Sequence, residues 1–171
     1  ISLIFWQILN NRNKQIKSFF IISKKKLPFL ILILFLFLQI TFGAFVSGLN
    51  AGKLHQTWPL MGYSYFPDDL QINKIIDLLN FNDHSLVQFY HRNIAYLISI
   101  YILILTFVTF KRKETQLYKP SGLLLIVLFI QVFLGIYTLL SDLNIFISSA
   151  HQITSVILIL TALNLYYYTI K

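Results

Sequence analysis

The stretch Val87-Gln88-Phe89-Tyr90-His91-Arg92-Asn93-Ile94-Ala95-Tyr96 decides the fold, because it opens an apolar run that reaches Phe110. It places a histidine and an arginine about two turns inside a segment that must be a membrane helix. Ionisable groups at this depth mark function by default, since an arginine at the bilayer centre costs roughly 2.5–3.5 kcal/mol. A second segment, Ala150-His151-Gln152, lies at the same depth in another apolar run. We therefore interpret the rest of the chain as a frame for His91 and His151.

The composition is that of a polytopic membrane protein. The chain has 171 residues, of which 57% are hydrophobic and 12% charged, and its mean hydropathy is +0.70. A soluble domain could not bury that much apolar surface. The net charge of +8 lies in short loops between apolar runs, where it sets topology, so we expect no nucleic-acid partner. Cysteine is absent, which excludes disulfides, thiolate ligands and cysteine nucleophiles.

Four apolar segments are long enough to span a bilayer as helices. We expect the spans at residues 27–47, 85–110, 121–140 and 145–170. Residues 48–82 would form a long loop whose aromatic and amphipathic content predicts a cap at the membrane interface. We interpret residues 1–26 as the tail of a preceding membrane helix followed by a basic loop, and so expect the chain to be the carboxyl-terminal part of a longer protein.

The distribution of basic residues predicts the orientation. The amino-terminal loop, the loop at 111–119 and the carboxyl terminus hold eleven Lys or Arg and one acid, whereas the other side holds two Lys and five Asp. The basic loops are then cytoplasmic, or in the matrix, and the long loop faces outward. Richness in Ile, Lys, Asn and Phe indicates an AT-rich bacterial genome. We therefore expect a bacterial inner membrane rather than a mitochondrial one.

An internal repeat predicts the architecture. At an offset of 92, the first and third spans align Pro28, Leu36, Phe37, Gln39 and Gly43 with Pro120, Leu128, Phe129, Gln131 and Gly135. The second and fourth spans align at an offset of 60, through the two histidines. This pattern predicts an all-α, four-helix membrane bundle made of two hairpins, which are related by a pseudo-two-fold axis along the membrane normal.

Two imidazoles that enter the bilayer from one side at matching depth are what a haem iron clamped between helices requires. We predict that His91 and His151 are the axial ligands of one iron. The alternative is that each is a buried polar residue hydrogen-bonded across the bundle. Zinc is disfavoured because no third or fourth ligand occurs at this depth. We expect His84 to be a water-facing residue at the helix start, and His55 to lie on the loop surface.

Three further residues are candidates for the same site. Gly43 and Gly135 would let a macrocycle lie against the helix backbone, or they would simply let helices pack closely. Arg92 would face a haem propionate, or it would bind Asp83 or a loop carbonyl. Both pairs of alternatives stay open at this point. No Asp or Glu occurs within any span, so we expect no proton-transfer machinery of the chain's own.

These segments resemble the haem A synthase family, membrane enzymes that oxidise a methyl group of haem O to the formyl group of haem A. Residues Gly43-Ala44-Phe45-Val46-Ser47-Gly48-Leu49-Asn50-Ala51-Gly52 and Thr57-Trp58-Pro59-Leu60-Met61 are similar to the fifth span and outer loop of that family. Val87 to Arg92 with Ala95-Tyr96 resembles the sixth span, and Ala150-His151-Gln152 the eighth. The resemblance runs from about residue 27 to the end.

The resemblance implies an eight-helix protein whose carboxyl-terminal half holds a b-type haem between histidines matching His91 and His151. Haem O would be oxidised in the amino-terminal half, by a second histidine pair and an acidic residue that this chain lacks. We carry over no catalytic residue, and expect this fragment alone to be inactive. Haem O synthase or a second copy are the candidate partners, and the electron donor is not indicated. The alternative is a stand-alone bis-histidine b-type cytochrome that takes electrons from quinol.

Overall fold

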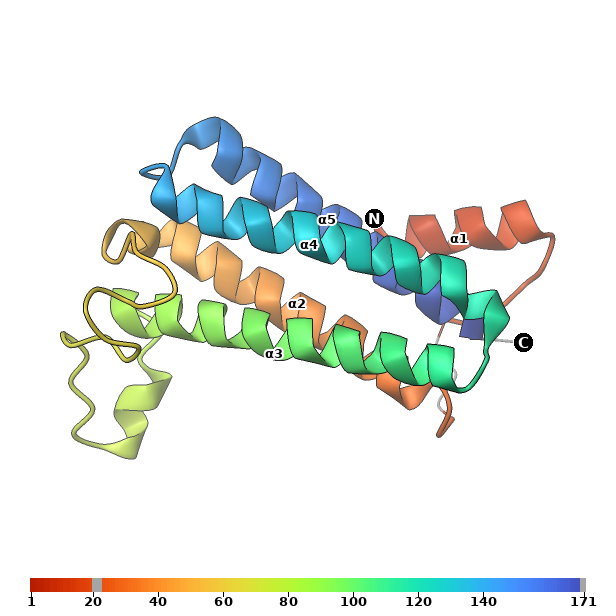
Figure 1. Cartoon of the computed structure of the whole chain (residues 1–171), viewed down its shortest axis with the longest axis horizontal. Helices are drawn as coiled ribbons and strands as arrows, with labels where there is room; N and C mark the ends of the chain where they lie inside the picture. Colours follow the sequence, from red (N-terminus) through yellow and green to blue (C-terminus); the bar gives the residue numbers. More distant parts are fainter. Residues whose placement is uncertain (20–22, 170–171) are drawn as a thin grey trace.

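The computed structural model describes residues 1–19 and 23–169, and within them every regular element is a helix (Figure 1). The four long helices are α2 (Leu27–Gly48), α3 (His84–Lys111), α4 (Tyr118–Leu140) and α5 (Ile145–Thr169). The short elements are α1 (Ser2–Asn13), η1 (Ala51–Lys53), η2 (Ile75–Leu79) and η3 (Thr115–Leu117). Each long helix is apolar enough to cross a membrane. The expected all-helical fold with four spans is confirmed.

Local sequence explains where these helices begin. Pro28 lies in the first turn of α2, where its missing N–H costs nothing. The Asp83 side chain caps α3 by accepting a hydrogen bond from the N–H of Leu86 at 3.0 Å. Helix α4 begins at Tyr118, three residues before the predicted start, because Pro120 is accommodated within its first turn. Residue 170, the predicted end of the fourth span, lies outside the described residues.

The two hairpins pack into one bundle. The closest contacts join α2 with α3 and α4 with α5, and further contacts join α2 with α5 and α3 with α4. Helices α3 and α5, which carry the two histidines, therefore lie diagonally across the bundle (Figure 1). This arrangement is what the repeat predicts, since each odd-numbered span contacts the histidine helix of the other hairpin.

The hydrophobic core lies in the half of the bundle that we predict to be cytoplasmic. Leu32 of α2, Ile102 of α3, Leu124 of α4 and Leu163 of α5 are completely buried there. Among the described residues, α4 buries side chains only as far as Leu128, and α5 only from Leu158 onward. The outer halves of these two helices, where His151 lies, thus carry only partly buried or exposed side chains.

Helix α1 lies alongside the carboxyl-terminal part of α5. The Trp6 ring contacts Tyr166 and Tyr167 with centroid distances of 5.7 and 5.1 Å. Its indole N–H donates to the carbonyl of Lys17 at 2.8 Å, which ties the following segment back onto α1. That α1 is the tail of a preceding membrane helix stays a prediction.

The long loop closes over the outer end of both hairpins. A Cβ built on Gly52 would lie 3.0 Å from the side chain of Leu143, in the turn between α4 and α5. The Gln56 amide donates to Asp142 of the same turn at 2.7 Å. On η2, Ile75 and Ile76 are 86% and 64% exposed. Exposed isoleucines beside the ends of membrane helices are consistent with the predicted interfacial cap.

Candidate functional site

His91 lies two turns inside α3 and is held by a glutamine of α2. The Gln39 amide nitrogen lies 3.1 Å from His91 Nδ1 and 3.4 Å from His91 Nε2. The same amide donates to the His91 backbone carbonyl at 3.1 Å. One glutamine therefore sits against the ring and anchors the helix that carries it.

His151 lies two turns inside α5 and is held by the equivalent glutamine of α4. Its Nδ1 lies 3.2 Å from the backbone carbonyl oxygen of Gln131. Because a carbonyl can only accept, this contact requires the proton on Nδ1 and leaves a lone pair on Nε2. The Gln131 amide nitrogen lies 3.5 Å from that Nε2. A neutral imidazole with its lone pair on Nε2 is the form that binds a metal, and the Gln131 amide would have to move away from this atom for a metal to bind there.

The two glycines face these imidazoles. A Cβ on Gly135 would lie 2.9 Å from His151 Cε1, and a Cβ on Gly43 would lie 3.2 Å from His91 Cε1. Real Cβ atoms essentially never approach a heavy atom more closely than 3.0 Å. Each glycine thus makes room for the ring of the neighbouring helix. Of the two alternatives left open for these glycines, the structure contains the close packing of neighbouring helices. Contact of either glycine with a macrocycle stays a prediction.

The repeat therefore builds the same unit twice: a glutamine and a glycine on one helix, four residues apart, and a histidine on its hairpin partner. The members are Gln39, Gly43 and His91 in one unit and Gln131, Gly135 and His151 in the other. In both units the glutamine Oε1 is buried and has no hydrogen-bond partner among the residues that the structure describes. The glutamine contacts were not predicted, although the pairing of glutamine and glycine within the repeat was the available signal.

The Arg92 guanidinium binds backbone carbonyls of the long loop and not a carboxylate. Its side chain points back into the loop and is only 8% exposed. One terminal nitrogen donates to the carbonyls of Thr57 and Leu60 at 2.8 and 3.2 Å, and the other to the carbonyl of His55 at 2.7 Å. Of the alternatives left open, the loop carbonyls are its partners here. A contact with a haem propionate stays a prediction.

A hydrogen-bonded cluster around His55 completes the loop, and sequence reasoning missed it. His55 Nε2 lies 3.2 Å from both Asp69 Oδ1 and Ser85 Oγ, and the side chain of His55 is only 13% exposed. Our interpretation of His55 as a loop-surface residue is therefore wrong, because this cluster draws it inward. His84 is exposed at the first position of α3, as expected.

The charge on Asp69 is stabilised by the same cluster. Burial alone would raise the pKa of this carboxyl. Hydrogen bonds from Ser85, from the backbone and from His55, together with the charge of His55, outweigh burial and lower the pKa of Asp69 below its usual 3.8. Asp69 is therefore ionised at neutral pH and accepts hydrogen bonds that fix the loop onto α3.

Comparison with known proteins identifies the family. A family model described as "Cytochrome oxidase assembly protein" matches residues 1–163. The chain belongs to this family. It is similar to a protein named "Heme A synthase" from Pelagibacter ubique, with 40% identity over 93% of this chain and 46% of that protein. Proteins of the same name from Rickettsia africae and Wolbachia pipientis are 35% and 40% identical over 92% and 75% of this chain, and 47% and 35% of their own lengths.

Membership in this family confirms the resemblance found in the sequence. With four helices able to span a bilayer, this family member is an integral membrane protein. The chain spans about half the length of the curated relatives that it matches most extensively, at 46–47% of their length. No solved structure gives a significant match to the fold.

Proposed function

We propose that this chain is the haem-holding carboxyl-terminal part of a haem A synthase, and that His91 and His151 are the axial ligands of one b-type haem. The observation that carries this proposal is the repeated glutamine–glycine–histidine unit, which occurs once on each hairpin with its histidine two turns inside α3 or α5. Two ligands on diagonal helices suit a flat macrocycle between them.

The residues present fit such a group. The Nδ1 contact of His151 with the Gln131 carbonyl leaves the lone pair on Nε2, where a metal would replace the long contact with the Gln131 amide. Among residues 1–19 and 23–169, no three His, Cys, Asp or Glu side chains gather to hold a bare metal ion. A haem iron needs only two, because four of its ligands come from the macrocycle. The partial burial of the outer halves of α4 and α5 also supports a bulky apolar group at this level.

The chain's own residues would position and shield the group, which when bound supplies one-electron redox chemistry. The glutamines orient the imidazoles, and the glycines leave room for their rings. Arg92 holds the loop over the outer end of the bundle, where it would limit access of water to the ligands. The partner of the buried Arg92 Nε, which has none among the described residues, would be a propionate or a water molecule.

We further propose that the oxidation of haem O belongs to the part of the relatives that this chain does not span. None of the four long helices carries an Asp or Glu, so their interior offers no carboxylate for proton transfer. The relatives share the name "Heme A synthase", which points to a methyl-to-formyl oxidation of haem O. We place the protein in a bacterial inner membrane, with residues 48–82 outside.

A haem titration of the purified chain tests the ligand proposal. We expect saturation at one haem per chain and a low-spin b-type absorption spectrum. The double variant His91→Ala/His151→Ala should lose that spectrum. The matched control is His84→Ala, which removes an exposed imidazole from the same helix as His91 and should change nothing. No low-spin haem on the wild-type chain would indicate a membrane scaffold without haem. An unchanged spectrum in the double variant would contradict the assignment of the two histidines as ligands.

Haem extraction separates the synthase from the stand-alone cytochrome. The full-length gene, with and without His91→Ala, would be expressed in a host that makes haem O but no haem A. Accumulation of haem A with the wild-type gene, and of haem O with the variant, is the expected result. Low-spin haem in the membranes with no haem A from the wild-type gene would instead support a cytochrome that only transfers electrons.

A further inference from the structure

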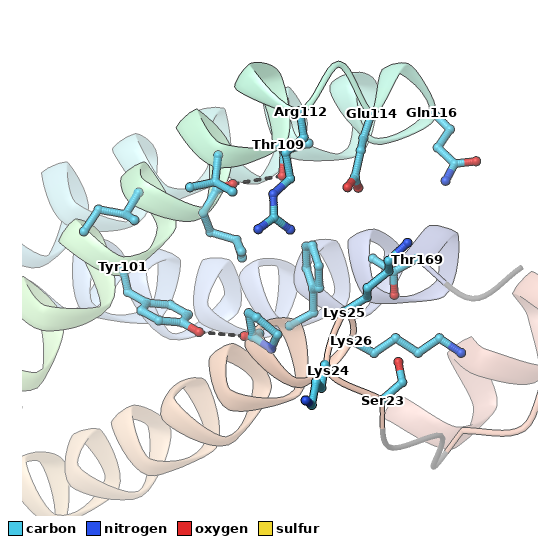
Figure 2. Close-up of a pocket in the computed structure, with 15 residues that line it drawn as sticks. Ser23, Lys24, Lys25, Lys26, Tyr101, Thr109, Arg112, Glu114, Gln116 and Thr169 are labelled. Carbon is cyan, nitrogen blue, oxygen red and sulfur yellow. Dashed lines mark hydrogen bonds between the residues drawn. The ribbon is translucent and has the colours of Figure 1, made fainter.

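A cavity of about 540 Å³ lies at the predicted cytoplasmic end of the bundle, and no histidine lines it (Figure 2). It is bordered by the segment before α2, by the end of α3 with the following turn, and by the last residue of α5 that is described. The charged residues that line it are Lys24, Lys25, Lys26, Arg112 and Glu114. Four basic side chains against one acid give the lining a net charge of +3.

The inner part of this cavity is apolar. Phe29 of α2 and Ile104, Leu105 and Val108 of α3 line it. Ile104 is 56% exposed, so part of this surface remains open to the acyl-chain region of a bilayer. The change from charged to apolar lining follows the sequence, because Lys26 is directly followed by the uncharged helix α2. The cavity therefore lies at the level where the headgroups of a bilayer meet its acyl chains.

The basic side chains of the lining have no carboxylate partner in the described part of the chain. Within residues 1–19 and 23–169, no ion pair joins Glu114 or any other carboxylate to Arg112 or to Lys24, Lys25 or Lys26. Figure 2 shows Arg112 and Glu114 pointing from the end of α3 and the following turn toward the start of α2. Tyr101 donates a hydrogen bond to the Pro28 carbonyl at 2.9 Å and thereby holds the two helices together below the charged rim.

We propose that this cavity binds an anionic phospholipid of the cytoplasmic leaflet, with its phosphate on the Lys24–Lys26 segment and Arg112, and its acyl chains against Phe29 and Ile104. Basic pockets between membrane helices on the cytoplasmic side suit such headgroups. A free phosphate would use the charges but not the apolar lining. The net charge of +3 favours a headgroup with two phosphates, such as cardiolipin, over one with a single phosphate.

Topology alone does not account for this arrangement. Lys111, Lys113 and Lys119 lie on the same side of the membrane, are exposed, and do not line the cavity. They satisfy the positive-inside rule equally well. The lining residues differ from them in bordering one partly apolar cavity, and this provides a matched control for the test.

Native mass spectrometry of the full chain, released from nanodiscs that contain phosphatidylcholine and a small fraction of cardiolipin, tests the proposal. We expect retained cardiolipin on the wild-type chain. The triple variant Lys24→Gln/Lys26→Gln/Arg112→Gln should bind it about fivefold more weakly for each charge removed, or roughly a hundredfold in total. The control variant Lys111→Gln/Lys113→Gln/Lys119→Gln loses the same charge and should retain the lipid.

Three outcomes would count against a lipid seated in this cavity. An equal loss in the two triple variants would overturn the proposal, because it would show a general attraction between the charged end and the leaflet. Displacement of cardiolipin by millimolar inorganic phosphate would also overturn it, in favour of an ion site. Ile104→Asp, which leaves the basic side chains in place, should weaken retention of cardiolipin, and unchanged retention would contradict the apolar half of the site.

Discussion

The two hairpins of this protein are built from the same unit but are closed in different ways. Both place a glutamine and a glycine against a histidine of the partner helix. The hairpin of α2 and α3 is joined by a long loop that Arg92 binds through three carbonyls, whereas α4 and α5 are joined by a short turn. At the position equivalent to Arg92, the second hairpin has Gln152, which is exposed. The comparison shows that both hairpins contain the glutamine–glycine–histidine unit, whereas only the first has a long loop bound by an arginine.

Replacing Arg92 with glutamine makes the first hairpin like the second and should have the largest effect. Three loop carbonyls would lose a charged donor, at a cost of about 3 kcal/mol, the upper end for hydrogen bonds to a charged group. The carbonyls of His55 and Leu60 would each keep a second, uncharged donor. We expect a lower melting temperature and faster hydrogen exchange around residues 55–60. Gln152→Ala, in the equivalent exposed position, should leave both unchanged. Equal exchange in Arg92→Gln and wild type would mean that the loop is held by other contacts.

The glycines allow a comparison of the two units within one experiment. Leucine at either position should push the facing imidazole away, and overpacking of this kind costs about 1–3 kcal/mol. Because the Cβ of residue 135 would approach His151 at 2.9 Å and that of residue 43 would approach His91 at 3.2 Å, Gly135→Leu should lose more haem than Gly43→Leu.

The haem-to-protein ratio after purification measures this difference. Gly122→Leu is the control, since a Cβ on Gly122 of α4 meets nothing within 4 Å. Wild-type haem content in both Gly43→Leu and Gly135→Leu would show that neither glycine is needed next to its histidine, and would leave the glycines without a role in the site.

The two glutamine variants should differ in how far they shift the haem reduction potential, which is a smaller effect than loss of haem. The Gln39 amide nitrogen lies 3.1 and 3.4 Å from the two ring nitrogens of His91, and the Gln39 backbone also hydrogen-bonds to the ring, so Gln39→Leu removes two close side-chain contacts and leaves the backbone contact. In Gln131→Leu the side-chain contact that is lost is the longer one, at 3.5 Å, and the backbone carbonyl would likewise still accept from His151 Nδ1. We therefore expect a larger shift of the haem reduction potential in Gln39→Leu than in Gln131→Leu, measured by redox titration of the absorption spectrum. Equal shifts would contradict the assigned difference between the two imidazoles.

The acidic limb of the pH–stability profile tests the loop cluster, with the smallest expected effect. Since the pKa of Asp69 is lowered in the folded protein, its contribution to stability is present above the unfolded pKa of about 3.9 and is lost as the pH falls through the lower folded pKa. The difference in melting temperature between wild type and Asp69→Asn should therefore be largest at neutral pH and shrink below about pH 4. The neighbouring Asp68→Asn serves as the control. A difference that grows on acidification would contradict the assigned role of Asp69.

Much of this architecture could be predicted because membrane helices and repeats leave strong one-dimensional signals. Uninterrupted apolar segments indicated the spans, and the offsets of 92 and 60 related the hairpins and paired His91 with His151. The short turn at Ser141-Asp142 also followed, because two spans separated by four residues must form a hairpin.

The contacts that could not be predicted depend on helix rotation and on the path of a loop. Periodicity placed Gln39 and Gly43 on one face of a helix, but it did not say that this face meets His91. The partners of Arg92 are backbone carbonyls, which carry no residue-specific signal. The prediction for His55 was wrong for the same reason, because its burial depends on how the loop folds back onto Ser85.

The most direct test of the central claim is the haem stoichiometry of the two single variants, His91→Ala and His151→Ala. If both imidazoles bind one iron, each variant should lose the whole low-spin signal of the wild-type chain, leaving high-spin haem or none. If the two histidines served separate haems, each variant would keep the low-spin haem of the other site, and if other residues were the ligands, both variants would keep the whole signal. Low-spin spectra retained in either single variant would contradict the shared-iron proposal.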